Sequence, residues 1–486
     1  MTIRHAALWS LASQYASFAI QFAVSVIISR LYLLPADVGL FSIALAAAMM
    51  VSILQDLGIS RFVTGQPEMR PELLRDYAAV AVGIGWLVAG AIAVMASPFA
   101  RLYGEPGLLK LMLIIAASYV ALPLALVPAA MLTRAMNFRI LFLVNAGSAL
   151  AGGVVAIASA AGGAGPASLA WGMLATALAR LIIVQLANPL LPRLPRQLAA
   201  VRPLIDFGRS SLVICISGAL GMRSQDLIVG HLLGTTATGL FTRASALAGQ
   251  MSTLVVGSIS GVFYPAFARK RDAGEDLAEP YLHLVACNTG AQWAAAVGMA
   301  LAAEPLVHLL YGPNWQAVAP LLRWTALAEI FFMAIPLQMD IPILLGRIRT
   351  LVWINLVDTF LTVVLLAVFC LWGLEAAALS RVAIGAVWFA IYAPFLSGLM
   401  RLKPTTLASV YLRSAVCAAA AGVPLLIARA LGWFAPDMPF ALFAGLCLAG
   451  VVCWLVALPL VAHPLWQEVR LGLSKLGWRS PTRQHA

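Results

Sequence analysis

Charged side chains are scarce in this sequence of 486 residues, where Asp, Glu, Lys and Arg together make up only 10%. A soluble chain carries roughly 25% charged residues, because a surface that faces water needs them. Apolar residues make up 62% of the sequence, and the mean hydropathy is +0.94. The shortage of charge excludes a soluble multidomain enzyme and predicts an all-α, polytopic integral membrane protein.

Familiar catalytic and metal-binding motifs are also missing. The sequence has no phosphate-binding P-loop, no G-x-S-x-G motif and no cysteine/histidine cluster with the spacing of metal ligands. Its six cysteines lie inside apolar runs, where they are expected to pack as small apolar side chains. We therefore expect no metal, no cofactor and no catalytic residue, and we do not expect an enzyme.

A cleavable signal peptide and a separate soluble domain are likewise not expected. The first apolar run is interrupted by Gln14 and Gln21 and lacks a convincing cleavage site. Apolar runs of about 20 residues, the length that crosses a bilayer, recur along the chain instead. They predict fourteen spans, near 7–29, 38–63, 77–97, 108–131, 140–163, 166–188, 208–233, 239–265, 281–303, 317–345, 350–372, 375–399, 407–430 and 438–462.

Basic residues collect at alternate ends of these spans. With a cytoplasmic N-terminus, twenty of the 31 Lys and Arg fall in cytoplasmic segments, and four (Arg30, Arg101, Lys110 and Arg429) in the opposite ones. Such a bias orients membrane proteins, so we expect both termini in the cytoplasm and an even number of spans. It also explains the net charge of +12 without nucleic acid, because basic loops face anionic lipid.

The sequence also repeats itself at an offset that grows from 200 to 210 residues. The matched segments are Gly39-Leu40-Phe41 with Gly239-Leu240-Phe241, Tyr103-Gly104 with Tyr311-Gly312, and Arg139, Leu141 and Asn145 with Arg349, Leu351 and Asn355. Each repeat holds six spans, so the two repeats share one orientation, as in transporters whose halves rock about a cavity. The predicted organisation is an N-terminal six-helix lobe at 1–190, a cytoplasmic linker at 191–207, a C-terminal six-helix lobe at 208–400, and two additional helices with a basic cytoplasmic tail at 401–486.

One segment carries a family resemblance. Ser224-Gln225-Asp226-Leu227-Ile228-Val229-Gly230, followed by Thr238-Gly239-Leu240-Phe241, resembles the seventh-to-eighth span signature of bacterial polysaccharide transporters, with Phe241 in place of the more usual tyrosine. Val262-Phe263-Tyr264-Pro265-Ala266 resembles the end of the eighth span. The similarity runs over roughly residues 1–400 and is to Wzx-type flippases of the multidrug/oligosaccharidyl-lipid/polysaccharide exporter superfamily.

That resemblance implies an activity and its partners. Such proteins move undecaprenyl-diphosphate-linked oligosaccharides from the cytoplasmic to the periplasmic leaflet of the bacterial inner membrane, by alternating access, for exopolysaccharide, capsule or O-antigen synthesis. The implied partners are the lipid-linked substrate, membrane lipids, a polysaccharide polymerase and glycosyltransferases. An ion-coupled drug or metabolite antiporter and a peptidoglycan-precursor flippase of the same superfamily remain alternatives. A membrane polymerase or ligase is less favoured, because no large periplasmic loop is predicted.

Ionisable residues inside the spans are the candidates for a site, because each costs about 2.5–3.5 kcal/mol at mid-bilayer on insertion scales. Guanidinium groups of Arg223 and Arg180 match the oxygens of a diphosphate. Asp226 lies one helical turn after Arg223, so a structural ion pair between them is an equal alternative. The complete set of cavity candidates is Arg223, Arg180, Asp226, Arg30 and Arg243.

Three acidic residues are candidates for ion coupling or gating. Glu329 and Asp358 lie deep in their spans, and Asp56 lies two turns inside the second span. The alternative for each is a pairing with a nearby arginine. Prolines also indicate where a hinge or binding region lies. Pro123/Pro128 and Pro336/Pro342 occupy corresponding spans of the two repeats, and they predict helix kinks there.

Overall fold

The computed structural model describes residues 3–55, 59–65, 71–193, 198–434 and 438–475. Every regular element in these ranges is helical, which confirms the all-α fold. The helices form two compact units. Unit 1 comprises Met1–Thr242, Leu310–Trp315 and Thr359–Leu374, and unit 2 comprises Arg243–Leu309, Gln316–Asp358 and Glu375–Ala486.

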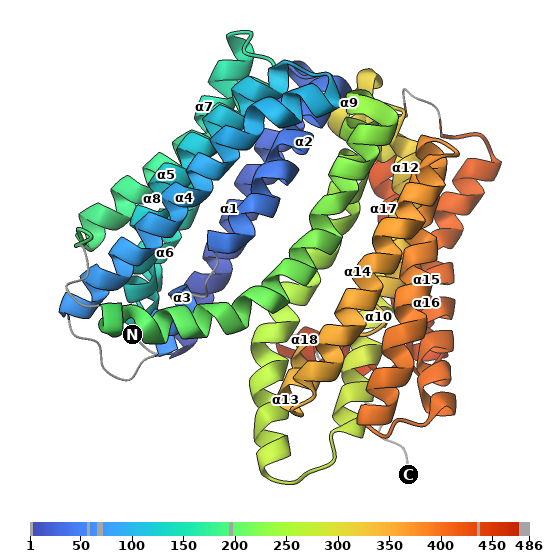
Figure 1. Cartoon of the computed structure of the whole chain (residues 1–486). Coiled ribbons are helices and arrows are strands. Elements are labelled where there is room, and N and C mark those ends of the chain that lie inside the picture. Colours follow the sequence, from blue (N-terminus) through green and yellow to red (C-terminus); the bar gives the residue numbers. More distant parts are fainter. Residues whose placement is uncertain (1–2, 56–58, 66–70, 194–197, 435–437, 476–486) are drawn as a thin grey trace. The chain divides into compact units, whose positions relative to one another are not determined.

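Unit 1 begins with eight α-helices. They are α1 (Ile3–Leu31), α2 (Pro35–Ser52), α3 (Ile59–Gly65), α4 (Pro71–Tyr103), α5 (Gly107–Arg134), α6 (Phe138–Phe142), α7 (Ser148–Ala161) and α8 (Ala167–Ala187). Helix α4 packs along α5, α5 along α8, and α8 along α7 (Figure 1). Buried Ile43, Ile92 and Leu111 join α2, α4 and α5 in one core. Because lipid is as apolar as these side chains, close packing rather than escape from water holds the helices together.

Helix α9 (Leu198–Asp272) contains both the predicted seventh and eighth spans. Gly234 is its one residue with non-helical backbone angles, φ 86° and ψ 178°. Glycine adopts positive φ at little cost because it has no Cβ, so the helix direction changes between the two predicted spans. The helix starts at Leu198, which lies inside the predicted linker 191–207. The bounds of the four predicted segments stay a prediction.

Nine α-helices follow α9 in the part of the chain that the structure describes. They are α10 (Ala278–Leu301), α11 (Ala303–Tyr311), α12 (Val318–Phe332), α13 (Asp340–Leu344), α14 (Ile348–Cys370), α15 (Leu374–Leu399), α16 (Pro404–Ala430), α17 (Phe440–Leu460) and α18 (Leu465–Lys475). In unit 2, α10 packs against both α12 and α16, and α16 packs against α17. Buried Tyr281, Trp388 and Tyr392 lie in the core of this unit.

The predicted tenth span is interrupted in its middle. Helix α12 ends at Phe332 and α13 begins at Asp340, and Leu337 between them has a positive φ of 56°. Side chains of α10 and α16 donate hydrogen bonds to the carbonyl groups of this interruption. The four bonds are Trp293 Nε1 to Ile330 O (2.8 Å), Asn288 Nδ2 to Met333 O (2.6 Å), Tyr411 Oη to Ala334 O (3.0 Å) and Tyr281 Oη to Pro336 O (3.1 Å).

Membrane spans are recognisable over most of the described chain. Eleven helices in the described residues are long and apolar enough to cross a bilayer. They correspond to the predicted spans other than the seventh, eighth and tenth, which fall on α9 and on the interrupted α12–α13 segment. The polytopic class is thus confirmed, while the count of fourteen stays a prediction.

Candidate functional site

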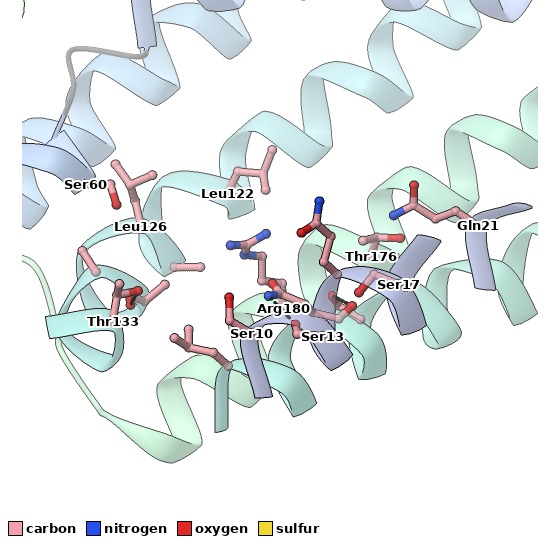
Figure 2. Close-up of a pocket in the computed structure, with 18 of the residues that line it drawn as sticks. Ser10, Ser13, Ser17, Gln21, Ser60, Leu122, Leu126, Thr133, Thr176 and Arg180 are labelled. Atoms are coloured by element: carbon pink, nitrogen blue, oxygen red, sulfur yellow. Dashed lines mark hydrogen bonds between the residues drawn. The ribbon is translucent and has the colours of Figure 1, made fainter. Parts of the chain in front are cut away.

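A polar cavity of about 900 Å³ lies within unit 1. Its wall is formed by residues of α1, α5 and α8, with additions from the end of α2, from α3 and from the α6–α7 segment. Figure 2 shows Arg180 surrounded by Ser10, Ser13 and Ser17, with Thr133 and Thr176 further along the wall. A cavity lined with hydroxyl and amide groups inside a bilayer is a place for a hydrophilic ligand or for water.

One polar face of α1 forms a large part of the wall. Its residues are Ser10, Ser13, Gln14, Ser17 and Gln21. Apart from the adjacent pair Ser13 and Gln14, successive residues are three or four positions apart, which places all five on one side of the helix. In the sequence, Gln14 and Gln21 stand out only as interruptions of an apolar run. The spacing of all five residues is the signal that could have identified this face.

The rest of the wall offers further hydrogen-bonding groups. It includes Ser52, Gln55, Ser60, Tyr119, Thr133, Asn145, Ser148 and Thr176. Asn145 Nδ2 donates to Ser13 Oγ at 3.0 Å, which fixes the amide at the wall. Thr176 Oγ1 donates to the carbonyl of Gly172 at 2.9 Å. By contrast, the buried hydroxyl of Ser17 has no hydrogen-bond partner among the described residues, so it is available to a ligand or to water.

Arg180 supplies the positive charge of the cavity. It projects from α8, is half-buried, and is the one ionisable residue besides Tyr119 among the described lining residues. Within the described part of the chain, Arg180 takes part in no ion pair within 4.0 Å and no hydrogen bond. Because charges act more strongly at low dielectric than in water, this guanidinium makes the cavity attractive to an anion.

Arg223 and Asp226 lie on α9, also in unit 1. Asp226 Oδ1 accepts a hydrogen bond of 2.8 Å from the hydroxyl of Thr242. Among the described residues no N–O contact within 4.0 Å joins Asp226 to Arg223, although the two interact electrostatically. Arg223 also interacts electrostatically with Tyr119, which lines the cavity. Arg223 is not itself among the described lining residues, so its link to the cavity is this electrostatic interaction.

The other predicted basic candidates are not among the described lining residues. Arg30 is exposed at the end of α1, and its side chain reaches within 3.8 Å of the position that a Cβ on Gly312 would occupy. Arg243 is half-buried and belongs to unit 2. The structure therefore places Arg180 in the cavity wall and the remaining members of the predicted set elsewhere. Their roles stay predictions.

Two of the predicted acidic candidates, Glu329 and Asp358, belong to unit 2 and are not among the described lining residues. Glu329 on α12 interacts electrostatically with half-buried Arg381, whose guanidinium lies 4.9 Å from the centre of the Phe332 ring. Asp358 on α14 is half-buried and acts on Tyr392. Asp56 falls outside the described residues. The described neighbourhood of Glu329 resembles the arginine pairing that was the alternative to ion coupling.

Sequence comparison identifies relatives for much of the chain. Residues 27–320 match the family described as "Polysaccharide biosynthesis protein". The succinoglycan biosynthesis transport protein ExoT of Rhizobium meliloti (strain 1021) is 25% identical over 66% of this chain. The lipopolysaccharide biosynthesis protein WzxC of Escherichia coli (strain K12) is 22% identical over 59%. The matches span 65% and 58% of the length of these two relatives.

Structural comparison places the fold among membrane transporters. The lipid II flippase MurJ in an inward closed conformation aligns with a TM-score of 0.74 at 13% identity, covering 93% of this chain and 97% of MurJ. An inward-facing multidrug resistance transporter of the MATE family aligns with a TM-score of 0.52 at 14% identity, covering 83% and 97% of the two chains. At these identities the likeness concerns the fold alone. The match to residues 27–320 covers more than half of the sequence, and the chain therefore belongs to the polysaccharide biosynthesis protein family.

Proposed function

We propose that the protein is a flippase that carries undecaprenyl-diphosphate-linked oligosaccharide units from the cytoplasmic to the periplasmic leaflet. The observation that carries the proposal is the polar cavity of unit 1, which combines the cation Arg180 with a wall of hydroxyl and amide groups. Membership of the family and the transporter names of its relatives agree with this function.

The two kinds of lining group suit the two parts of such a substrate. The guanidinium of Arg180 can donate two parallel hydrogen bonds to phosphate oxygens. Serine, glutamine and asparagine side chains can both donate to and accept from sugar hydroxyls, and the polar face of α1 supplies such groups. The polyprenyl tail needs no polar partner and stays in the lipid. The described lining contains no Asp or Glu that would repel a diphosphate.

Alternating access completes the proposed cycle. The cavity is exposed first to the cytoplasm, where the lipid-linked unit is assembled by glycosyltransferases, and then to the periplasm, where a polymerase uses it. The basic bias of the loops supports this orientation, with both termini in the cytoplasm. No bond is made or broken, so the proposed activity needs no catalytic residue and no cofactor.

A transport assay in vesicles tests the proposal. Purified protein is reconstituted with a lipid-diphosphate oligosaccharide, and the rate at which the glycan reaches the opposite leaflet is measured. Arg180→Ala should lower that rate roughly 10- to 100-fold, because hydrogen bonds to charged groups contribute about 1.5–3 kcal/mol. Arg180→Lys should retain part of the rate, since it keeps the charge but loses the planar fork.

Controls separate binding from folding and from general surface charge. Arg429→Ala removes an exposed arginine at the end of α16 and should leave the rate unchanged. A polyprenyl glycoside without phosphate should move slowly in the unaltered protein and should be insensitive to Arg180→Ala. Equal rates for both lipids, or for Arg180→Ala and the unaltered protein, would remove the case for diphosphate recognition. Faster movement of lipid II or of a cationic drug would favour the precursor flippase or the antiporter instead.

A further inference from the structure

A π-helical turn lies within the fifth predicted span, in unit 1. It comprises Leu143–Gly147 and separates α6 from α7. A π turn holds more residues than an α-helical turn, is rare, and occurs frequently at functional sites. Its middle residue, Asn145, belongs to the wall of the polar cavity. An irregular turn and a polar lining residue therefore coincide at one position of this span.

The segments on either side of the π turn pack against different helices. Before the turn, the ring of Phe142 meets Trp9 of α1 edge to face, with ring centres 5.5 Å apart. After the turn, a Cβ on Gly152 would lie 2.7 Å from the carbonyl oxygen of Gly172, so the backbones of α7 and α8 are in close contact. The additional residue of the π turn offsets the helix between these two contacts. The turn thereby sets which of its side chains is presented to the cavity.

A neighbouring side chain holds the Asn145 amide in place. Its Nδ2 donates to Ser13 Oγ of α1 at 3.0 Å. A primary amide can donate two hydrogen bonds and accept two more, so this bond leaves an N–H and the oxygen Oδ1 for a ligand. Ser17 follows Ser13 by one helical turn, and its buried hydroxyl has no hydrogen-bond partner among the described residues. Asn145 and Ser17 thus both adjoin Ser13, and together they offer donors and acceptors.

These groups match sugar hydroxyls better than phosphate. A hydroxyl group both donates and accepts, as an amide and a serine do, whereas an ionised phosphate oxygen only accepts. Ser13 and Ser17 lie beside Arg180, which supplies donors for phosphate, in the same wall (Figure 2). The cavity volume of about 900 Å³ falls in the range of small-ligand pockets, about 300–1,000 Å³. A diphosphate and nearby sugar hydroxyls therefore fit in one space.

We infer that Asn145, positioned by the π turn, binds a hydroxyl group of the glycan and so discriminates between lipid-linked glycans, while Arg180 binds the diphosphate. The inference rests on the proposed function, because it divides one substrate between two residues. The opposing interpretation is that the π turn serves packing alone. In that case the bond between Asn145 and Ser13 only ties α1 to the fifth span.

Two lipids separate these interpretations in the vesicle assay. One is the transported polyprenyl-diphosphate oligosaccharide, and the other is polyprenyl diphosphate without sugar, used as a competitor. Asn145→Leu is similar in size but cannot form hydrogen bonds. It should raise the half-maximal concentration of the oligosaccharide lipid roughly 2- to 12-fold, the effect of one neutral hydrogen bond. The maximal rate and the concentration of competitor that halves transport should change much less, whereas Arg180→Ala should weaken both lipids.

A matched control lies in the same turn. Leu143 is exposed and is not among the described lining residues, so Leu143→Ala should alter neither lipid. If Asn145→Leu weakens both lipids equally, or weakens neither, the residue does not recognise the glycan and the inference fails. If the unaltered protein moves no lipid-linked oligosaccharide, the proposed function fails instead.

Positioning is tested by a double-mutant cycle and by a deletion. Ser13→Ala releases the amide and should weaken the oligosaccharide lipid. Combined with Asn145→Leu it should add little, because the two residues act through one bond. Deletion of Leu143 removes the additional residue and closes the π turn to an α-helix, so the preference for the glycan should weaken as in Asn145→Leu. Additive single effects, or an unchanged preference after the deletion, would show that the turn does not position Asn145 for the substrate.

Discussion

The fourth span of the chain and the tenth, its counterpart in the second repeat, both contain two prolines, yet their backbones differ. Helix α5 runs without interruption from Gly107 to Arg134 through Pro123 and Pro128. The corresponding segment stops at Phe332 and resumes at Asp340. Proline content alone therefore does not decide whether a membrane helix continues.

Hydrogen-bond donors on neighbouring helices account for the difference. Pro128 has no N–H to offer the carbonyl of Leu124, four residues earlier. Gln185 Nε2 of α8 donates to that carbonyl at 3.1 Å, so α5 continues with the freed group satisfied. Around the interruption after α12, α10 and α16 provide donors to four carbonyls. Because a bilayer offers no water to unpaired carbonyls, backbone can leave the helix only where such donors exist.

The two spans also border different surroundings. Tyr119, Leu122 and Ala125 of α5 line the polar cavity of unit 1. A pocket of about 520 Å³ in unit 2 is bordered by α10, α16 and α17 and has an apolar wall that includes Leu306, Phe443 and Trp454. The repeats thus share a helical plan, while their polar side chains serve different purposes. In unit 1 many of them line a cavity, whereas in unit 2 those of α10 and α16 support the interrupted backbone.

The largest expected effect comes from removing the donors of the interruption. Asn288→Leu combined with Trp293→Phe leaves the carbonyls of Met333 and Ile330 unpaired in a buried setting. We expect a loss of roughly 1–3 kcal/mol for each unsatisfied group. Thermal unfolding in detergent should show a midpoint lower by several degrees, and hydrogen exchange should rise at 330–340 while α5 stays protected. Equal exchange in both segments would contradict the comparison.

A smaller loss of stability is expected at acidic pH. It too should be confined to α10 and α16, the helices whose side chains bond to the interruption after α12. His463 accepts from the N–H of Leu465 at 3.2 Å and contacts Ser414 Oγ at 3.0 Å, which in turn contacts Thr289 of α10. Burial, with a further contribution from Arg413, lowers the pKa of His463 from 6.5 to about 4. The unfolded chain then binds a proton that the folded chain does not, between these two values.

Stability should consequently fall as the pH decreases from about 6.5 towards 4, and should be constant with respect to this group above that range. The unfolding midpoint is measured across this window for the unaltered protein and for His463→Gln, which keeps a donor towards Ser414. Exchange in α10 and α16 should increase with acid in the unaltered protein more than in the variant. The same slope in both proteins would show that another group is responsible.

The smallest effect is expected at the continuous helix. Trp86 of α4 donates to the carbonyl of Val120 at 3.3 Å, but its side chain is about half exposed to the surroundings of the protein. Trp86→Phe should change the free energy of unfolding by less than about 0.5 kcal/mol, because α5 retains its own backbone bonds. A loss as large as that of the Asn288 and Trp293 variant would mean that α5 depends on external donors as well.

Much of the fold could be predicted from apolar runs and their Pro, Gly and charge breaks. The predicted ninth span at 281–303, for example, corresponds to α10 at Ala278–Leu301. The predicted break between the seventh and eighth spans falls at Gly234, whose backbone angles are non-helical, whereas the start of α9 at Leu198 inside the predicted linker was not expected. Pro336 indicated an interruption in the tenth span. The length of that interruption could not be predicted, because it depends on hydrogen-bond donors from α10 and α16, which are distant in the sequence.

For the site, isolated charge is the informative signal and mild polarity is not. Arg180 stands alone in an apolar run, so its cost in lipid makes it a candidate on the sequence alone. Ser13 and Ser17 lower the local hydropathy only slightly, and averaging over a span hides their common face. Arg223 was expected in the cavity on the same grounds as Arg180; it is not among the described lining residues, and its role stays a prediction, because composition does not say which face of a span is lined.

Gly39 and Gly239, which correspond in the two sequence repeats, bear on how such a chain arose. A Cβ on Gly39 would lie 1.7 Å from the carbonyl oxygen of Thr235, and a Cβ on Gly239 would lie 1.8 Å from that of Pro35. Reciprocal contacts of this kind are those that two identical subunits form about a two-fold axis. An ancestor of half the length, with one such glycine and one such carbonyl, would have paired with its own copy through the same surface. In the present chain the two units differ, because polar side chains line a cavity in unit 1 and support an interrupted helix in unit 2.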